Sequence, residues 1–213
     1  MRKMLTALVC LALAALVLPS VGLALIPQEG TGVVCVFTTL DPDDAANANY
    51  VESVTTNVPF NVYFFFYHPW PGGDYEGEDR PAVSSLNGFE FSWRLDPDPG
   101  ATMFVLAVNL PPTALNIGDN FNLVVGLGTP LPFQGSDYVL LADFNLMFSV
   151  APPATDMYLE PSVPASIENF MGYNDGANAA LIYKMYPNTV DGAYGVPVFG
   201  FNKSVATESQ TWS

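Results

Sequence analysis

Short runs of apolar or alternating residues recur along this chain, and Pro, Gly, Asn and Asp separate one run from the next. Runs of this length, bounded by turn-forming residues, are typical of β-strands. No segment carries the apolar spacing of three and four residues that marks an amphipathic helix. The sequence therefore predicts an all-β fold. We expect strands at 32–38, 59–67, 88–95, 103–110, 121–127, 138–150, 180–185 and 196–201.

Two of these segments alternate between apolar and polar positions, so each turns one face to a core and the other to water. The expected core faces consist of Phe89, Phe91, Trp93 and Leu95 in one strand and of Ala142, Phe144, Leu146, Phe148 and Val150 in the other. Sheets with one apolar face bury it by packing against each other. We therefore expect an antiparallel β-sandwich of the immunoglobulin-like or jelly-roll type.

The segment 62–67 departs from this alternation, because aromatic residues occupy both of its faces. Something must therefore cover its outer face. Two covers are open at this point. One is the part of the chain from Asp156 onward, folded back over the sheet, and the other is a partner molecule.

The first 24 residues have the pattern of a secretory signal peptide. Arg2 and Lys3 stand at its start, an apolar run occupies 5–18, and the small residues Gly22 and Ala24 stand at its end. The apolar run is short for a bilayer span. We expect a signal helix that is cleaved after Ala24, which gives a secreted, periplasmic or cell-surface protein without stable membrane insertion. The alternative is an uncleaved anchor.

Beyond the signal peptide, residues 25–202 suit a single sandwich domain. Pro152 and Pro153 mark the best internal boundary, and the pattern after them is richer in loops. We expect residues 151–202 to cap the sandwich as an elaboration of the same domain. Residues 203–213 are expected to form a polar C-terminal tail.

The charge balance disfavours one class of partner. The chain has 21 Asp and Glu residues against 6 Lys and Arg residues, a formal net charge of −15. Cleavage of the signal peptide would also remove Arg2 and Lys3. Because a polyanion would be repelled, we expect no nucleic-acid partner, and binding to anionic membranes is disfavoured for the same reason. The expected partner is an extracellular protein or a glycan.

Cys35 is the one cysteine outside the predicted signal peptide, which contains Cys10. The mature chain therefore cannot form an internal disulfide. An intermolecular bridge and a reactive thiol are both open to Cys35. Its apolar neighbours, Val34 and Val36, favour a buried thiol that acts as a small hydrophobic residue.

The stretch 87–97, Asn-Gly-Phe-Glu-Phe-Ser-Trp-Arg-Leu-Asp-Pro, resembles the glycine, alternating aromatic strand and Asp-Pro turn of cohesin-like β-sandwich modules in secreted bacterial proteins. Segments 58–62 and 140–150 are similar to an early and a late strand of those modules, so the resemblance covers residues 32–150. It implies a non-catalytic extracellular module that binds a protein or a glycan. Leu95 stands where the modules commonly have an aromatic residue, and the chain from Ala151 onward has no counterpart in them.

Residues suited to catalysis are few. His68 is the single histidine, which excludes a site built on two histidines, and its position before a loop of Pro and Gly favours a role in the turn. No Gly-x-Ser-x-Gly elbow is present to hold a serine nucleophile. A pair of carboxylates could still hydrolyse a glycoside without histidine. The acids available for such a pair are Glu52, Glu90, Glu160 and Glu168.

A structural calcium ion would need only oxygen ligands that lie close together. Asp41, Asp43, Asp44 and Asn47 supply four such side chains in one short stretch, although their spacing matches no standard calcium loop. The acidic residues in 74–79 form a second group, and their Gly-rich surroundings are more typical of a solvated loop. No other cofactor is expected.

Trp70 and Tyr75 lie in a loop rich in Pro and Gly, where exposed aromatic rings could stack on a sugar. The same rings could instead fold down as a plug over the end of the sheet. The sequence as a whole predicts a secreted structural or protein-interaction module without catalysis. The alternatives are a carbohydrate-binding module that uses Trp70 and Tyr75, and a glycoside hydrolase that uses a carboxylate pair.

Overall fold

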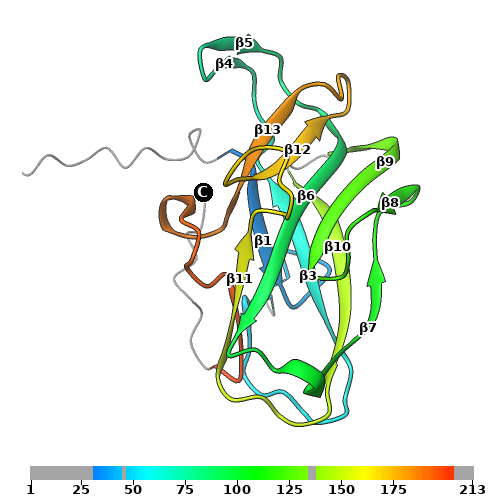
Figure 1. Ribbon diagram of the computed structural model, residues 1–213, viewed down its shortest axis with the longest axis vertical. Coiled ribbons are helices and arrows are strands. Elements are labelled where there is room, and N and C mark those ends of the chain that lie inside the picture. Colours follow the sequence, from blue (N-terminus) through cyan, green and yellow to red (C-terminus); the bar gives the residue numbers. More distant parts are fainter. Residues whose placement is uncertain (1–30, 45–46, 134–137, 204–213) are drawn as a thin grey trace, which may run out of the picture.

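The computed structural model describes residues 31–44, 47–133 and 138–203 (Figure 1). The predicted signal peptide and residues 204–213 of the predicted tail lie outside the described residues. Within them, regular structure consists of β-strands and the short 3-10 turns Gly100–Thr102 and Val190–Gly192, so the prediction of an all-β fold is confirmed. No helix in these ranges is long and apolar enough to cross a membrane.

The strands are β1 (Val33–Phe37), β2 (Tyr50–Val51), β3 (Phe60–Tyr67), β4 (Gly73–Tyr75), β5 (Glu78–Arg80), β6 (Ser85–Asp96), β7 (Met103–Asn109), β8 (Ala114–Asn116), β9 (Asn122–Pro132), β10 (Tyr138–Phe148), β11 (Thr155–Glu160), β12 (Met171–Asp175), β13 (Ile182–Pro187) and β14 (Phe199–Phe201). The eight segments predicted from the sequence all contain a strand.

The first layer of the sandwich has the strand order β13-β1-β3-β10-β7. Within it β1, β3, β10 and β7 are antiparallel neighbours, whereas β13 runs parallel to β1. In the described chain β7 pairs with β10 alone, so it forms the edge of this layer (Figure 1).

The long strand β6 is the centre of the second layer. It pairs with β12 through its first half and with β11 through its second half, and its other side pairs with β9. Strand β8 is added to β9, and β14 and β2 extend the layer beyond β11. Because β13 pairs with both β12 and β1, it joins the two layers.

Aromatic side chains fill the space between the two layers. Phe64 of β3 stacks on Phe91 of β6 with ring centroids 5.5 Å apart, and Phe144 of β10 meets Trp93 of β6 edge-on at 5.3 Å. Both alternating segments bury the faces expected from the sequence, except that Val150 is exposed. Large buried aromatic residues contribute most of the burial that stabilises such a core.

Residues 151–202 do not cap the sandwich, so that prediction is corrected. Strands β11 and β12 pair with β6, and β13 pairs with β1, so this part of the chain supplies strands inside the layers. The sequence pattern misses this because the pairing joins segments far apart in the chain.

The outer face of β3 is covered by its own layer. Phe65 is buried there, and its ring centroid lies 6.0 Å from Phe37 of β1 and 5.9 Å from Tyr138 of β10. The chain from Asp156 onward packs on the inner face instead, where Tyr173 lies 4.7 Å from Phe66. Phe65 is therefore buried within the described chain, and a partner molecule over the rest of this face stays a prediction.

Cys35 is buried in β1, which confirms the prediction of a buried thiol. Its burial raises the pKa of the thiol because the charged thiolate loses its hydration. Such a thiol is unreactive while the fold is intact.

Candidate functional site

Trp70 and Tyr75 do not form an exposed sugar-binding platform. Only 7% of Trp70 and 3% of Tyr75 is exposed, and the two rings meet edge-on at 5.2 Å. A ring buried at this level has no free face on which a sugar could stack. The structure therefore corrects the prediction that the two rings are exposed to stack on a sugar. It agrees with the alternative that they fold down over the end of the sheet.

The β4–β5 hairpin holds these rings in place. The Tyr75 hydroxyl accepts a hydrogen bond from the Lys184 backbone N–H at 2.8 Å, and the Tyr75 ring lies 4.9 Å from Tyr183. The Arg80 guanidinium lies over the Tyr75 ring at 4.4 Å and donates to the Ile182 carbonyl at 2.9 Å. Burial raises the pKa of Tyr75. The hairpin is therefore anchored to β13.

The side chains of the proposed calcium loop make local turn contacts. Asp41 Oδ1 accepts the Asp43 N–H at 3.0 Å, and Asn47 Nδ2 donates to the Pro42 carbonyl at 3.0 Å. Across the described part of the chain, no three His, Cys, Asp or Glu side chains gather closely enough to hold a metal ion. A calcium ion at Asp41, Asp43, Asp44 and Asn47 stays a prediction.

The glutamates proposed as a hydrolytic pair lie in separate places. Glu90 is buried and accepts hydrogen bonds from the Ser166 N–H at 2.6 Å and the Ser166 hydroxyl at 2.9 Å. Glu160 pairs with Arg94 at 2.6 Å, and Glu52 and Glu168 are exposed. The structure does not bring any two of these side chains into one of the hollows described below. His68 directly follows β3 and has a φ of 52°.

Four well-exposed apolar residues lie on β7, on β8 and directly after β8. Phe104 and Leu106 of β7 are 43% and 48% exposed, and Leu115 of β8 and the following Ile117 are 66% and 75% exposed. The pairing of β7 with β10 shifts its register at Leu106, and Leu106 and Ala107 are both exposed there. We call residues 103–117 the open edge. It forms one side of the sandwich (Figure 1).

The open edge lies in a long uncharged part of the described chain. No charged residue stands between Asp98 and Asp119. Natural edge strands commonly carry charges or prolines that block pairing with another chain. Strand β7 has neither. Sequence analysis predicted the strand at 103–110 but missed this surface, and the uncharged run was the signal that could have revealed it.

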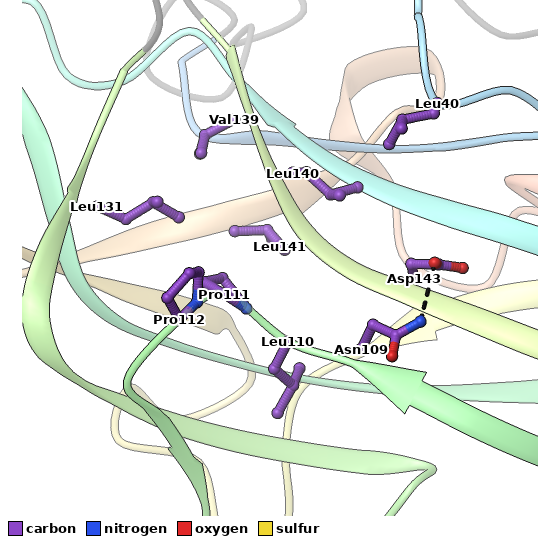
Figure 2. Close-up of a pocket in the computed structure, with 10 residues that line it drawn as sticks. All are labelled: Leu40, Asn109, Leu110, Pro111, Pro112, Leu131, Val139, Leu140, Leu141 and Asp143. Carbon is purple, nitrogen blue, oxygen red and sulfur yellow. Dashed lines mark hydrogen bonds between the residues drawn. The ribbon is translucent and has the colours of Figure 1, made fainter.

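A groove lies where the chain leaves the first layer after β7 (Figure 2). Its volume is about 350 Å³, and one of its ends carries Asp143, whose Oδ2 accepts a hydrogen bond from Asn109 Nδ2 at 3.1 Å. Asp143 Oδ1 is buried without a hydrogen-bond partner in the described chain. The lining residues are Leu40, Asn109, Leu110, Pro111, Pro112, Leu131, Val139, Leu140, Leu141 and Asp143. We call this hollow the β10 groove.

Two other hollows adjoin the open edge. One, of about 540 Å³, lies at the start of β7 and is lined by Met103, Trp93 and Phe121 among others. The other, of about 280 Å³, lies beside β8, where Leu115 and Ile117 face the buried Glu90. The larger hollow falls in the lower half of the ~300–1,000 Å³ range of ligand sites, and the smaller one falls just below that range. Each contains a single carboxylate residue.

Every basic side chain in the described ranges is already paired within the chain. Arg80 pairs with Glu78, Arg94 with Glu160, Lys184 with Glu76, and Lys203 with Asp156. The remaining acidic residues give the surface an excess of negative charge, so a positively charged partner would be attracted.

Comparisons with known proteins identify no family for this chain. No protein-family model matches it, and no curated protein does. Among solved structures, it is similar to a cohesin module from the family 33 glycoside hydrolase of Clostridium perfringens. The similarity has a TM-score of 0.39 and 9% sequence identity and covers 73% of this chain and 91% of that module. At these values the likeness identifies neither a family nor a partner.

Proposed function

We propose that this protein is an exported, non-catalytic protein-interaction module that docks its partner at the open edge. The observation that carries this proposal is the uncharged apolar strand β7, which pairs on one side only among the described strands and exposes Phe104 and Leu106. An edge of this kind is a template for pairing with another chain. Exposed apolar residues that gather on one side of a soluble protein mark an interaction site.

Main-chain pairing and apolar contact would work together at this edge. The unpaired N–H and C=O groups of β7 favour an extended partner segment, and the exposed leucine and phenylalanine side chains would lose contact with water on binding. The absence of charge between Asp98 and Asp119 means that no ionic group has to be desolvated there.

A library of random peptides displayed on phage tests this proposal. The immobilised protein is expected to enrich extended apolar peptides, and the double variant Leu106→Lys, Leu115→Lys is expected to bind them at least about tenfold more weakly, because the lysines interrupt the apolar contact. Both side chains are largely exposed, so the variant should remain folded.

Val190→Lys is the matched control, because Val190 is 42% exposed and lies on the 3-10 turn after β13, away from the open edge (Figure 1). It is expected to bind the enriched peptides like the unchanged protein. Equal binding by the edge variant would overturn the proposal. Retention of the protein on insoluble polysaccharides, unaffected by the edge variant, would instead indicate a glycan-binding module.

A further inference from the structure

Glu90 is a buried carboxylate that has no basic partner in the described chain. It is 7% exposed, and its two oxygens accept hydrogen bonds from the N–H and the hydroxyl of Ser166. These donors are neutral, and the basic side chains of the described ranges form ion pairs with other carboxylates. No ion pair therefore balances the negative charge of Glu90 within these ranges. A cation supplied by another molecule would stabilise such a charge.

Glu90 lines the hollow of about 280 Å³ beside β8, which we call the β8 hollow. It alternates with the core-facing aromatic residues of β6, so it lies on the outer face of the second layer. Glu90 pairs with Val124 of β9, and Gly126, on the same face of β9, pairs with Leu115 of β8 (Figure 1). Leu115 and Ile117 form the exposed apolar side of the hollow.

Gly126 keeps a path open between β8 and Glu90. A Cβ atom on Gly126 would meet nothing within 4 Å, so the described chain does not fill the space over this residue. Strand β9 lies between β8 and β6, and neighbouring strands are about 4.8 Å apart, so roughly 10 Å separates the backbones of β8 and β6. A long unbranched side chain that enters from β8 can therefore cross β9 over Gly126 and reach Glu90.

We propose that the β8 hollow binds a lysine side chain of the protein partner that docks at the open edge. This inference rests on the proposed function and names one residue of the partner. The lysine stem would lie against Leu115 and Ile117, and its ammonium group would donate to Glu90. Because both Glu90 oxygens already accept from Ser166, an ammonium group fits better than the two-pronged guanidinium of arginine.

The β8 hollow is continuous with the open edge, because Leu115 and Ile117 belong to both. A partner segment that docks at the open edge is thus close enough to place a side chain in the hollow. The formal net charge of −15 favours the approach of a cationic group. A second copy of this chain is a poor source of it, since both lysines of the described ranges, Lys184 and Lys203, are in ion pairs.

The probe for this inference is a single lysine blocked as its acetyl methylamide. Blocked norleucine, which has the same stem without the ammonium group, is its counterpart. In NMR titrations, blocked lysine is expected to shift the amide signals of Val124, Gly126 and Ser166, and blocked norleucine should bind at least about tenfold more weakly. Equal binding of the two probes, or shifts confined to other acidic segments, would overturn the inference.

Two variants test the role of the hollow in different ways. Glu90→Gln keeps the side-chain shape and removes the charge, so it should lower the affinity for blocked lysine to that for blocked norleucine. Gly126→Val leaves Glu90 and Ser166 in place and fills the hollow, so it should weaken both probes. Glu168→Gln, a change at an exposed carboxylate, is the control and should change neither. Lysine binding that survives both Glu90→Gln and Gly126→Val would contradict the proposed site.

Peptides selected on phage separate this inference from the proposed function. Replacement of their lysine by norleucine should weaken binding to the unchanged protein at least about tenfold and leave binding to the Glu90→Gln protein unchanged. Leu106→Lys lies outside the β8 hollow, so it tests docking at the open edge alone.

If Leu106→Lys weakens the selected peptides but blocked lysine leaves the Gly126 amide signal unchanged, the inference fails and the proposed function stands. If blocked lysine binds in the β8 hollow but no peptide is selected, the lysine site stands and docking at the open edge fails.

Discussion

Gly88 and Gly126 face one another across the β6–β9 pair, yet their surroundings differ. A Cβ atom on Gly88 would lie 2.7 Å from the Val125 carbonyl oxygen, which belongs to the backbone and cannot rotate away. A Cβ atom on Gly126 would meet nothing within 4 Å. One cross-strand pair therefore contains one position that requires glycine and one that does not.

Gly88→Ala is expected to lower the free energy of unfolding by about 1–3 kcal/mol, because the added methyl group forces β6 and β9 apart. Gly126→Ala should change it by less than about 0.5 kcal/mol. Urea unfolding followed by tryptophan fluorescence measures both. A Gly88→Ala protein as stable as its Gly126→Ala counterpart would contradict this account of the packing.

Single residues also show the limit of sequence reasoning about the site. The burial of Trp70 depends on a hydrogen bond from its backbone N–H to the Tyr173 hydroxyl at 3.0 Å, and these residues lie 103 positions apart. Loop composition around Trp70 carries no information about that contact. Cys35 could be predicted because its own neighbours in the sequence are apolar and bury it in β1.

At the scale of elements, the position of the β4–β5 hairpin depends on Tyr75, which sequence analysis considered as a ligand-binding residue. Tyr75 connects the hairpin to Tyr183 and to the Lys184 backbone N–H. Its role is therefore to fix one element against another.

Tyr75→Ala is expected to reduce stability by about 3–5 kcal/mol, because it removes a buried aromatic ring. It should also make the hairpin sensitive to proteases, which limited proteolysis with mass spectrometry would detect. Asp79→Ala, an exposed change on the same hairpin, is the control. Protease resistance equal to that of the control would show that Tyr75 does not anchor the hairpin.

The strands that sequence analysis found are those whose pattern is local. Strands β6 and β10 alternate over many residues, so their faces could be assigned from sequence. Strands β8, β11 and β12 are short, and β11 and β12 pair with β6, which lies far away in the chain. The open edge was missed because the position of a strand at the edge of a sheet depends on which strands pair. The alternation of apolar and polar residues does not indicate that pairing.

At the scale of the whole molecule, buried tyrosines make stability depend on alkaline pH. Burial raises the pKa of Tyr67, Tyr173, Tyr186 and Tyr194 in the folded state. The unfolded chain ionises these groups near their ordinary pKa of about 10. In the folded state these tyrosines keep their hydroxyl protons up to a higher pH than in the unfolded chain. The stability that they confer is therefore complete below pH ~10 and is lost as pH rises above it.

The melting temperature is therefore expected to be steady up to pH ~8.5, where the Cys35 thiol begins to ionise in the unfolded chain, and to fall steeply above pH ~10. Circular dichroism at constant ionic strength measures the melting temperature, and absorbance at 295 nm follows tyrosinate formation. The two transitions should coincide. Ionisation of all ten tyrosines at pH 10–11 with the fold intact would contradict the burial of these four side chains.

The pairing of β1 with β13, and of β2 with β14, has a consequence for how the chain is made. The earliest described strands pair with the last ones, and within the described ranges strand pairing joins the two layers only through β13. During synthesis the ribosome releases β1 and β2 long before β13 and β14 exist, so in that interval β1 can pair with β3 alone and β2 lacks β14. Closing such distant contacts is slow. A chaperone that holds the growing polypeptide, or transport before folding, would keep its aromatic strands from aggregating during that interval.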